Sequence, residues 1–528
     1  MPATRDRAFG WAFAARLDGF LVNLVRDSNG LNHASRRSSF GRLGVSLLVV
    51  VCGFAALFAH GRSLRAALGG SDFAAFYCAA TLVREGADPY RWMPLEACER
   101  ERVAKALGDD LAESDFDPAP LPGYAIAPFV PLSLLPYRTA ALLWDALLLA
   151  AVIASIEVLC ALTSLPRIGI AAALVGTAIV ASLPYGQIAP LALLALSASG
   201  LYLARGRPGP AALCAAVSLV QPQTGLAAFL ALILWVPRAR PYAAAGAAGL
   251  LALSLASVGL RGDLEYLRAV LPVQALAEAP FHIQLSATWL LYFAGVEQNR
   301  ALWLAQFDYA LMLAAGVLLA PRVARALGSK AALVFFPPVL VLLGGTYLHV
   351  FQLAAALPFA MLFASRARQG RGAAWAAVAL LSVAWQALGS HSMLILGALT
   401  VATIVWVAAV KLRIAVRVGL AMACAGFALI EPWAVTHASG VTLRVAQSAA
   451  AFEHSGIDMT LAPARHGYEL RLAPMLTGAS WRTFVEKMPF WLALLLVVGA
   501  GPAAVLPPWG YGRGNSKGRK GSLEASEV

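Results

Sequence analysis

Residues 140–161 read AALLWDALLLAAVIASIEVLCA, a run of 22 residues with two acidic side chains, Asp145 and Glu157, and no basic one. Each residue of an α-helix advances the chain by about 1.5 Å, so about 20 apolar residues cross the hydrocarbon core of a membrane. Backbone N–H and C=O groups inside lipid need partners within the protein, and a helix provides them within the segment. This stretch therefore predicts a membrane-spanning helix.

The rest of the chain has the same apolar character. Of its 528 residues, 60% are hydrophobic and 13% are charged, and the mean hydropathy is +0.70. A soluble domain is about half apolar and about a quarter charged. Apolar runs recur from residue 43 to residue 506. We therefore predict an all-α, polytopic transmembrane helical bundle of roughly 12 to 14 spans.

Basic residues lie at both ends of the chain and in short turns between the apolar runs. The first 42 residues contain seven arginines, and four Lys or Arg residues follow residue 512. Cytoplasmic loops are enriched in Lys and Arg, so both termini are expected inside the cell. The net charge of +13 is explained by this topology. Since no basic face with interleaved aromatic residues is present, we expect no nucleic-acid partner.

The alternation of basic turns and apolar runs divides the chain into segments. It places 184–187, 221–223, 261–284 and 347–352 in outer loops. The predicted segments are a basic cytoplasmic segment at 1–42, a transmembrane core at 43–430 with a first outer loop at 61–137, an outer polar segment at 431–487, a last span at 488–506 and a basic cytoplasmic tail at 507–528.

The first outer loop contains two stretches with helical periodicity. Apolar residues between 73 and 82 predict a short amphipathic helix on the membrane surface, which Gly86 ends, and 95–107 predicts a second one. Asp72 then lies at the start of the first helix, at the boundary between water and lipid. Two interpretations stay open for it: a helix N-cap, or a general base that is ionised at neutral pH because an unperturbed Asp has a pKa of about 3.9.

The cysteines and histidines carry no metal-ligand spacing. Cys78 and Cys98 both lie in the first outer loop, and either a disulfide or two free thiols fits the sequence. His437, His454 and His466 are scattered through the outer polar segment. We therefore predict no metal site.

Four stretches in the outer loops and at the ends of spans share a pattern with a known family. They are Asp72, Tyr77, Ala79, Gly86 and Pro89-Tyr90; Tyr124 to Phe129 followed by Pro131 and Leu135-Pro136; Gly186-Gln187 followed by Leu191 to Leu203 and Arg205-Gly206-Arg207; and Tyr347 to Gln352. In their order and spacing these stretches resemble glycosyltransferase family 87, the polyprenyl-phosphate-mannose-dependent mannosyltransferase-like membrane proteins with the GT-C architecture. The likeness runs from about residue 45 to about residue 410.

The resemblance implies a membrane hexosyltransferase that needs no cofactor, with mannose as the expected sugar. Its partners are a polyprenyl-phosphate-sugar donor, a lipid or glycan acceptor and membrane lipids. The catalytic outer loop is 61–137, where Asp72 takes the proton of the acceptor hydroxyl while the oxygen attacks the anomeric carbon with inversion. The active site then lies on the outer, periplasmic face of the inner (cytoplasmic) membrane.

The outer loops also contain the candidates for substrate binding. The leaving phosphate carries negative charge, so hydrogen-bond donors and cations are expected to converge on it. Each candidate also has a structural interpretation, as a side chain that satisfies a helix end or as an interfacial aromatic anchor. The predicted substrate-binding residues are His349, Gln187, Gln352, Tyr77, Tyr90 and Arg261, with His282 in the same loop as Arg261.

The chain departs from the family pattern at several positions. Gln221-Pro222 stands where the family commonly has Lys-Pro, and Gln352 stands where Asp is usual. The loss of a cation at 221 removes a group that would help to hold a phosphate. A transporter or flippase of a lipid-linked glycan is the alternative function, because Pro222 and Pro337-Pro338 interrupt spans.

Overall fold

The computed structural model describes residues 71–107, 116–176, 185–367, 369–383, 391–409, 442–444, 447–472 and 479–503, with a few isolated positions between them. Most of the predicted first span, the basic segment at 1–42 and the tail at 507–528 lie outside the described residues, as does His437. Within the described part the chain is mostly helical, which confirms the predicted helical class.

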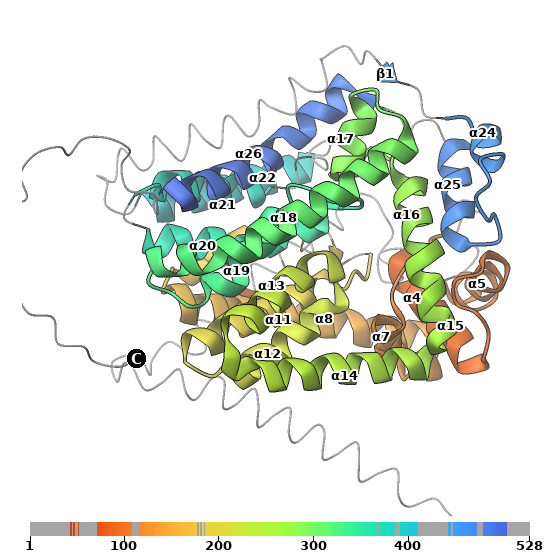
Figure 1. Cartoon of the computed structure of the whole chain (residues 1–528), viewed down its shortest axis with the longest axis horizontal. Helices are drawn as coiled ribbons and strands as arrows, with labels where there is room; N and C mark the ends of the chain where they lie inside the picture. Colours follow the sequence, from red (N-terminus) through yellow and green to blue (C-terminus); the bar gives the residue numbers. More distant parts are fainter. Residues whose placement is uncertain are drawn as a thin grey trace, which may run out of the picture.

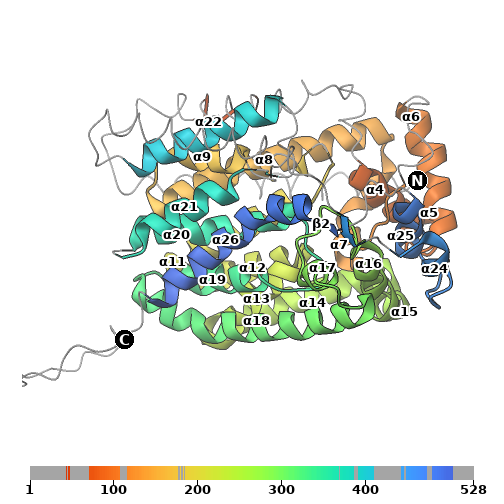
Figure 2. The same cartoon turned by 90° about the horizontal axis from the view of Figure 1, so that it is seen from above.

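The body of the protein is a set of helices that run in similar directions (Figures 1 and 2). These helices are α8 Tyr137–Thr163, α9 Arg167–Val175, α11 Ala189–Ala204, α12 Pro208–Val217, α13 Pro222–Trp235, α14 Arg240–Ser257, α18 Gln298–Ala326, α19 Ala332–Val341, α20 Leu357–Arg366, α21 Arg371–Leu381, α22 His391–Ala408 and α26 Trp481–Ala503.

Shorter elements connect the long helices, and several of them gather at one end of the bundle (Figure 1). They are α4 Ser71–Glu85, α5 Trp92–Cys98, η2 Glu99–Ala104, α6 Lys105–Leu107, α7 Gly123–Ile126, η3 Ala127–Phe129, η4 Leu132–Leu134, η5 Ser218–Val220, η6 Pro237–Ala239, α15 Gly259–Glu265, η7 Tyr266–Val270, α16 Leu271–Glu278, α17 Ala287–Phe293, η8 Val350–Ala356, α24 Ala449–Glu453, α25 Ala462–Leu472 and the antiparallel strands β1 Thr442–Arg444 and β2 Ala479–Ser480. We call the end formed by α4, α5, α15, α16, α24 and α25 the polar end.

Two described helices, Tyr137–Thr163 and Gln298–Ala326, are long and apolar enough to cross a membrane alone. A third candidate is the pair Pro237–Ser257 and Gly259–Glu278, which bends by 101° between its halves. Several further apolar helices among the described residues have 10 to 17 residues, which is about 15–25 Å and shorter than the hydrocarbon core of about 30 Å. The predicted count of roughly 12 to 14 spans is therefore not confirmed.

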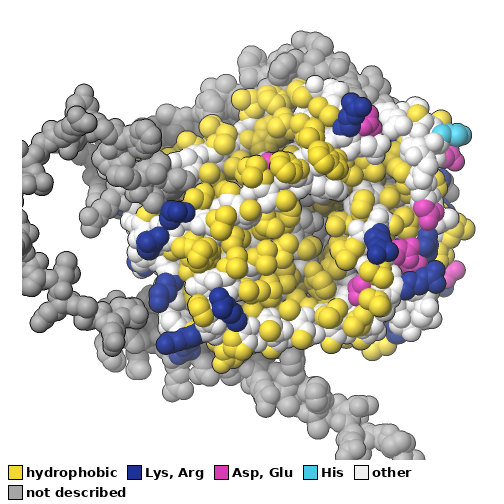
Figure 3. Space-filling view, in the orientation of Figure 1, with side chains coloured by type: hydrophobic (Ala, Val, Ile, Leu, Met, Phe, Trp, Pro, Cys, Tyr) yellow, Lys and Arg dark blue, Asp and Glu magenta, His cyan; other side chains and the backbone are white. Residues whose placement is uncertain are grey.

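The distribution of side chains fits a membrane-embedded body. Figure 3 shows hydrophobic side chains across most of one face, Lys and Arg at the end away from α15 and α16, and both signs of charge at the polar end. Helix α18 exposes Trp303, Phe307, Leu311 and Leu318, each by more than half of its surface. A soluble protein would bury such a stripe, so these residues are suited to contact lipid.

The first outer loop differs from the prediction in one respect. Helix α4 forms where it was predicted, and Gly86, with φ of +75°, follows its last residue. However, every residue from 73 to 82 is buried, so α4 is a core helix and not an amphipathic surface helix. The reason is that α5, η2, η3 and η4 pack against it. Cys78 and Cys98 form a disulfide, with Cα atoms 5.7 Å apart, and this joins α4 to α5.

Candidate active site

The start of α4 lies against the turn at residues 185–187. The Phe73 N–H donates a hydrogen bond of 3.1 Å to the Tyr185 carbonyl. Gly186 has φ of +70°, and a Cβ there would lie 2.5 Å from the Phe73 Cβ. Glycine is therefore required both by the backbone conformation and by the close approach. The next side chain, Gln187, lies close enough to the Asp72 carboxyl to lower its pKa.

Asp72 lies inside the first turn of α4, so the N-cap interpretation is wrong. The residue is half-buried, and the desolvation of its carboxyl raises the pKa well above the usual range for Asp. The nearby Asp117 carboxyl raises the pKa of Asp72 further, the Gln187 side chain lowers it, and Glu278 adds a smaller increase. The assumption of an unperturbed pKa near 3.9 is therefore wrong.

Asp117 links this carboxyl to the C-terminal part of the chain. It lies in the extended segment before α7, and its Oδ1 is 3.9 Å from Nδ1 of His466 in α25. The Asp117 backbone also hydrogen-bonds to the buried carboxyl of Glu99, whose pKa burial and the Asp117 charge raise well above its usual range. Three carboxyls from separate segments therefore lie around the start of α4.

Glu278 and His349 form the second half of the cluster. Glu278 is the last residue of α16, and its Oε2 is 2.6 Å from Nε2 of His349. The Gln284 side chain donates to the same oxygen at 2.8 Å. The Tyr347 hydroxyl donates to Oε1 at 3.3 Å, and the charges of Glu278 and Asp72, together with burial, raise the pKa of this hydroxyl. Glu278, Tyr347 and Asp72 are thus close enough to act on one another.

Hydrogen bonds join the segment that follows Glu278 to the segment that precedes His349. The Leu285 N–H donates to the Leu348 carbonyl at 2.8 Å, and the Ala287 N–H donates to the Gly345 carbonyl at 3.0 Å. The Leu348 N–H donates to Oε1 of Gln284 at 3.0 Å. The α16–α17 connection and the loop before η8 therefore form one rigid unit.

Helices α24 and α25 cover the cluster, and we call residues 447–472 the cap. Arg471 donates from Nη1 to the Ala277 carbonyl at 3.0 Å, directly beside Glu278. Gly467 approaches the same residue so closely that a Cβ would lie 2.6 Å from the Ala277 Cβ. This contact brings His466, which the sequence prediction left as a scattered histidine, to Asp117 and Glu278.

Arg91 fastens the cap to the first outer loop. Its guanidinium pairs with Asp88 at 3.1 Å, with Asp458 at 3.0 Å and with Glu265. Its Nη1 also donates to the Thr460 hydroxyl at 2.6 Å. One side chain thus joins the loop after α4, the helix α15 and the cap.

The other predicted binding residues occupy different environments. Gln352 accepts the His349 N–H at 2.7 Å, which uses its carbonyl oxygen. Tyr77 and Tyr90 are buried, and their hydroxyls donate to the carbonyls of Leu135 and Leu121. Neither ring has an exposed face on which a sugar could stack, so that part of the prediction is corrected.

Arg261 lies outside the cluster, on α15. It lines an open cavity of about 610 Å³ with Leu260, Leu264, Glu265 and Arg268. His282 lies in the connection after α16, where its ring meets Phe281 at 5.1 Å. Arg261 and His282 are therefore on different parts of the predicted outer loop.

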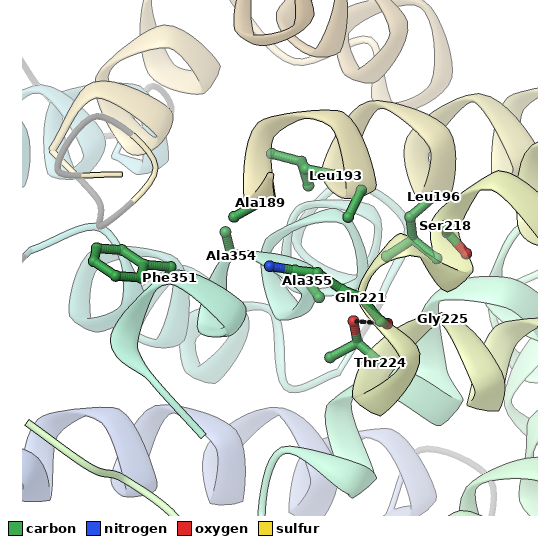
Figure 4. A pocket seen from close by; sticks show the side chains of 11 residues that line it. Ala189, Leu193, Leu196, Ser218, Gln221, Thr224, Gly225, Phe351, Ala354 and Ala355 are labelled. Atoms are coloured by element: carbon green, nitrogen blue, oxygen red, sulfur yellow. Dashed lines mark hydrogen bonds between the residues drawn. The ribbon is translucent and has the colours of Figure 1, made fainter. Parts of the chain in front are cut away.

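Gln221 lines a separate small cavity of about 10 Å³ (Figure 4). Its amide points between α11, α13 and η8, close to Ala189 and Phe351, and the residue is 7% exposed. Phe351 connects this cavity to the cluster, because its ring lies 6.2 Å from that of His349. The position at which the family commonly has Lys thus presents a neutral amide behind the site.

In a comparison with known protein families, the chain is similar to glycosyltransferases. The model that matches is that of glycosyltransferase family 87, over residues 122–344, and this confirms the resemblance seen in the motifs. The matched stretch contains Gln187 and Glu278, begins after Asp72 and ends before His349. No curated protein and no solved structure matches the chain.

Three residues of the cluster escaped the sequence prediction: Asp117, Glu278 and His466. Glu278 had a signal, because it is an acidic residue within a predicted outer loop that also holds Gln284. Asp117 and His466 are 349 positions apart (466 minus 117), and their encounter depends on the docking of the cap. Among the described residues, no three His, Cys, Asp or Glu side chains are arranged to hold a metal ion.

Proposed function

We propose that the protein is an inverting hexosyltransferase that uses a polyprenyl-phosphate-linked donor, with mannose as the expected sugar. The acceptor is a lipid or a glycan at the outer face of the cytoplasmic membrane. The observation that supports this proposal is the half-buried Asp72 carboxyl, which lies near Gln187, Asp117 and Glu278 within a cluster of carboxyls and imidazoles at the polar end. The family match supports sugar transfer as the reaction class.

Asp72 accepts the proton of the acceptor hydroxyl in this reaction. The acceptor oxygen forms a bond to the anomeric carbon, the bond between that carbon and the phosphate oxygen breaks, and polyprenyl phosphate leaves with the electron pair. A base transfers protons best when its pKa lies near the working pH. Burial and the Asp117 charge move the pKa of Asp72 in that direction.

The leaving phosphate needs positive charge or hydrogen-bond donors. His349 is the proposed partner inside the site, and Arg261 with Arg268 on α15 is the proposed partner where the donor lipid arrives. The amides of Gln187 and Gln352 lie beside Asp72 and His349 and are proposed to bond sugar hydroxyls.

Replacement of Asp72 by Asn tests the proposal, because it keeps the shape of the side chain and removes the base. Membranes that contain each variant are supplied with labelled polyprenyl-phosphate hexose, and transfer to lipid and glycan is measured. We expect Asp72→Asn to lose about a hundredfold or more of the rate. The matched control, Glu101→Gln, removes an exposed carboxyl of the same loop and keeps the rate. Unchanged transfer by Asp72→Asn contradicts the assignment.

A transporter or flippase of a lipid-linked glycan is the second candidate. The observation that favours it is the 101° bend between α14 and α15, together with Pro337 and Pro338 inside α19, since transporters use broken helices. In that case Asp72→Asn proteoliposomes move the lipid-linked glycan across the bilayer without any new glycosidic bond.

A further inference from the structure

Glu278 is a buried carboxyl on which hydrogen-bond donors converge. It is 3% exposed. Its Oε2 accepts a hydrogen bond of 2.8 Å from the Gln284 amide and lies 2.6 Å from Nε2 of His349. Its Oε1 accepts hydrogen bonds from the Gln274 amide and, at 3.3 Å, from the Tyr347 hydroxyl. All four partners are able to donate, so the arrangement suits a carboxylate, which only accepts.

The positive charge near this carboxylate comes from imidazoles. His349 and His466 are the basic groups that act on Glu278. Arg471 of the cap donates instead to the carbonyls of Leu276, Ala277 and Gly467. A buried anion is costly unless a cation pairs with it, so Glu278 favours the protonated, cationic state of the imidazole in contact with it.

The pair lies in the unit that the bonds between 284–287 and 345–348 make rigid. His349 is therefore fixed from two sides, by the Glu278 carboxylate at its ring and by Gln352 at its backbone N–H. A side chain that is held in this way loses little freedom when it binds a ligand.

We propose that Glu278 is a positioning residue for the reaction proposed above: it holds the His349 ring with a proton on Nε2 and supplies the negative charge that keeps this ring cationic toward the donor phosphate. The inference rests on the proposed function. It also accounts for the neutral Gln221, because an imidazolium beside Glu278 supplies a cation close to the site.

The groups around the ring define its pH dependence. The negative groups near the cluster are Glu278 and Asp72 from α16 and α4, and Asp117 from the segment before α7. His466 of the cap adds a competing positive charge, and Tyr347 stays neutral because its pKa is raised. Removal of the Glu278 charge therefore takes away the anion in direct contact with the ring.

A double-mutant cycle on binding of polyprenyl phosphate tests this role. Wild type, Glu278→Gln, His349→Gln and the double variant are purified in detergent, and their affinity for polyprenyl phosphate is measured between pH 5 and pH 9. We expect Glu278→Gln to weaken binding about tenfold or more and to move the alkaline loss of binding to lower pH. The double variant binds no worse than His349→Gln, because Glu278 acts through that ring.

Separate outcomes overturn the two proposals. The role of Glu278 is overturned if Glu278→Gln loses the same affinity for polyprenyl phosphate in the wild-type and His349→Gln backgrounds. An unchanged pH profile of binding overturns it as well. Both results count even if the wild type transfers sugar. A wild type that does not bind polyprenyl phosphate overturns both. Size-exclusion profiles show whether a variant has a folding defect. The variant Glu278→Asp retains the charge and should restore part of the binding, which identifies the lost charge as the cause. Glu453→Gln, an exposed carboxyl of α24, serves as the control.

Discussion

Replacement of Gly186 by Ala tests how closely the start of α4 is fitted to the Gln187 turn. The new Cβ would lie 2.5 Å from the Phe73 Cβ and 3.3 Å from its Cα. The φ of +70° costs an L-residue about 1–2 kcal/mol, and the overpacked contact costs about 1–3 kcal/mol. The free energy of unfolding should therefore fall by about 2–5 kcal/mol.

Gly206 offers a matched control for this experiment. Its φ is +72°, and a Cβ there would meet nothing within 4 Å. Gly206→Ala should therefore lower the free energy of unfolding only by the cost of the positive φ, about 1–2 kcal/mol. The difference between the two variants measures the contact with Phe73.

Two assays decide the outcome. Unfolding in mixed micelles by a titration with SDS gives the free energies, and sugar transfer gives the effect on the site. Since the turn must move away from α4, Gly186→Ala should move Gln187 away from Asp72 and lower kcat/KM about tenfold or more. If Gly186→Ala is no less stable than Gly206→Ala, the contact is not as tight as described and the reasoning is refuted.

The remaining predictions concern the disulfide, the acidic cluster and the cap. Replacement of Cys78 and Cys98 by Ala removes a cross-link between residues 20 positions apart and should destabilise α4 and α5 by about 3 kcal/mol. Hydrogen exchange of the amides in these helices measures this effect, and protection equal to that of the wild type would contradict it. Asp117→Asn removes a charge that raises the pKa of Asp72, so the acidic limb of the kcat/KM profile should move to lower pH, and a limb that stays in place argues against the coupling. Arg91→Ala should lower the free energy needed to open the cap by about 1 kcal/mol, which makes the open population about fivefold larger. This should appear as faster limited proteolysis within 447–472. Cleavage at the wild-type rate would exclude the role of Arg91 in fastening the cap.

Local signals in the sequence predicted parts of the fold well. The helix α4 and its end at Gly86 followed from periodicity and from a residue that accepts positive φ. The predicted number of membrane spans is not confirmed. Apolar composition alone does not show how long each helix is when breaks such as Pro222 and the prolines at 337–338 interrupt an apolar run. The burial of α4 depends on what packs over it, and a single segment does not contain that information.

The candidate site was predictable only where a motif marked it. Asp72, Gln187 and His349 stand in stretches that resemble a family pattern, and the structure places all three at the polar end. Asp117 and His466 stand in no such stretch. Their meeting requires the fit of Gly467 against α16, which depends on two helices far apart in the chain. The perturbed pKa of Asp72 has the same origin, because burial is a property of the assembled protein.

The cap has a consequence for the order in which the protein matures. Ribosomes make residues 447–472 after α22, so the described helices from α4 to α22 are synthesised before His466 exists. Until the cap has docked and Arg91 has engaged it, the carboxyls of Asp117 and Glu278 lack their C-terminal cover. A nascent chain therefore carries an uncovered acidic cluster, and the docking of the cap is the event that covers it.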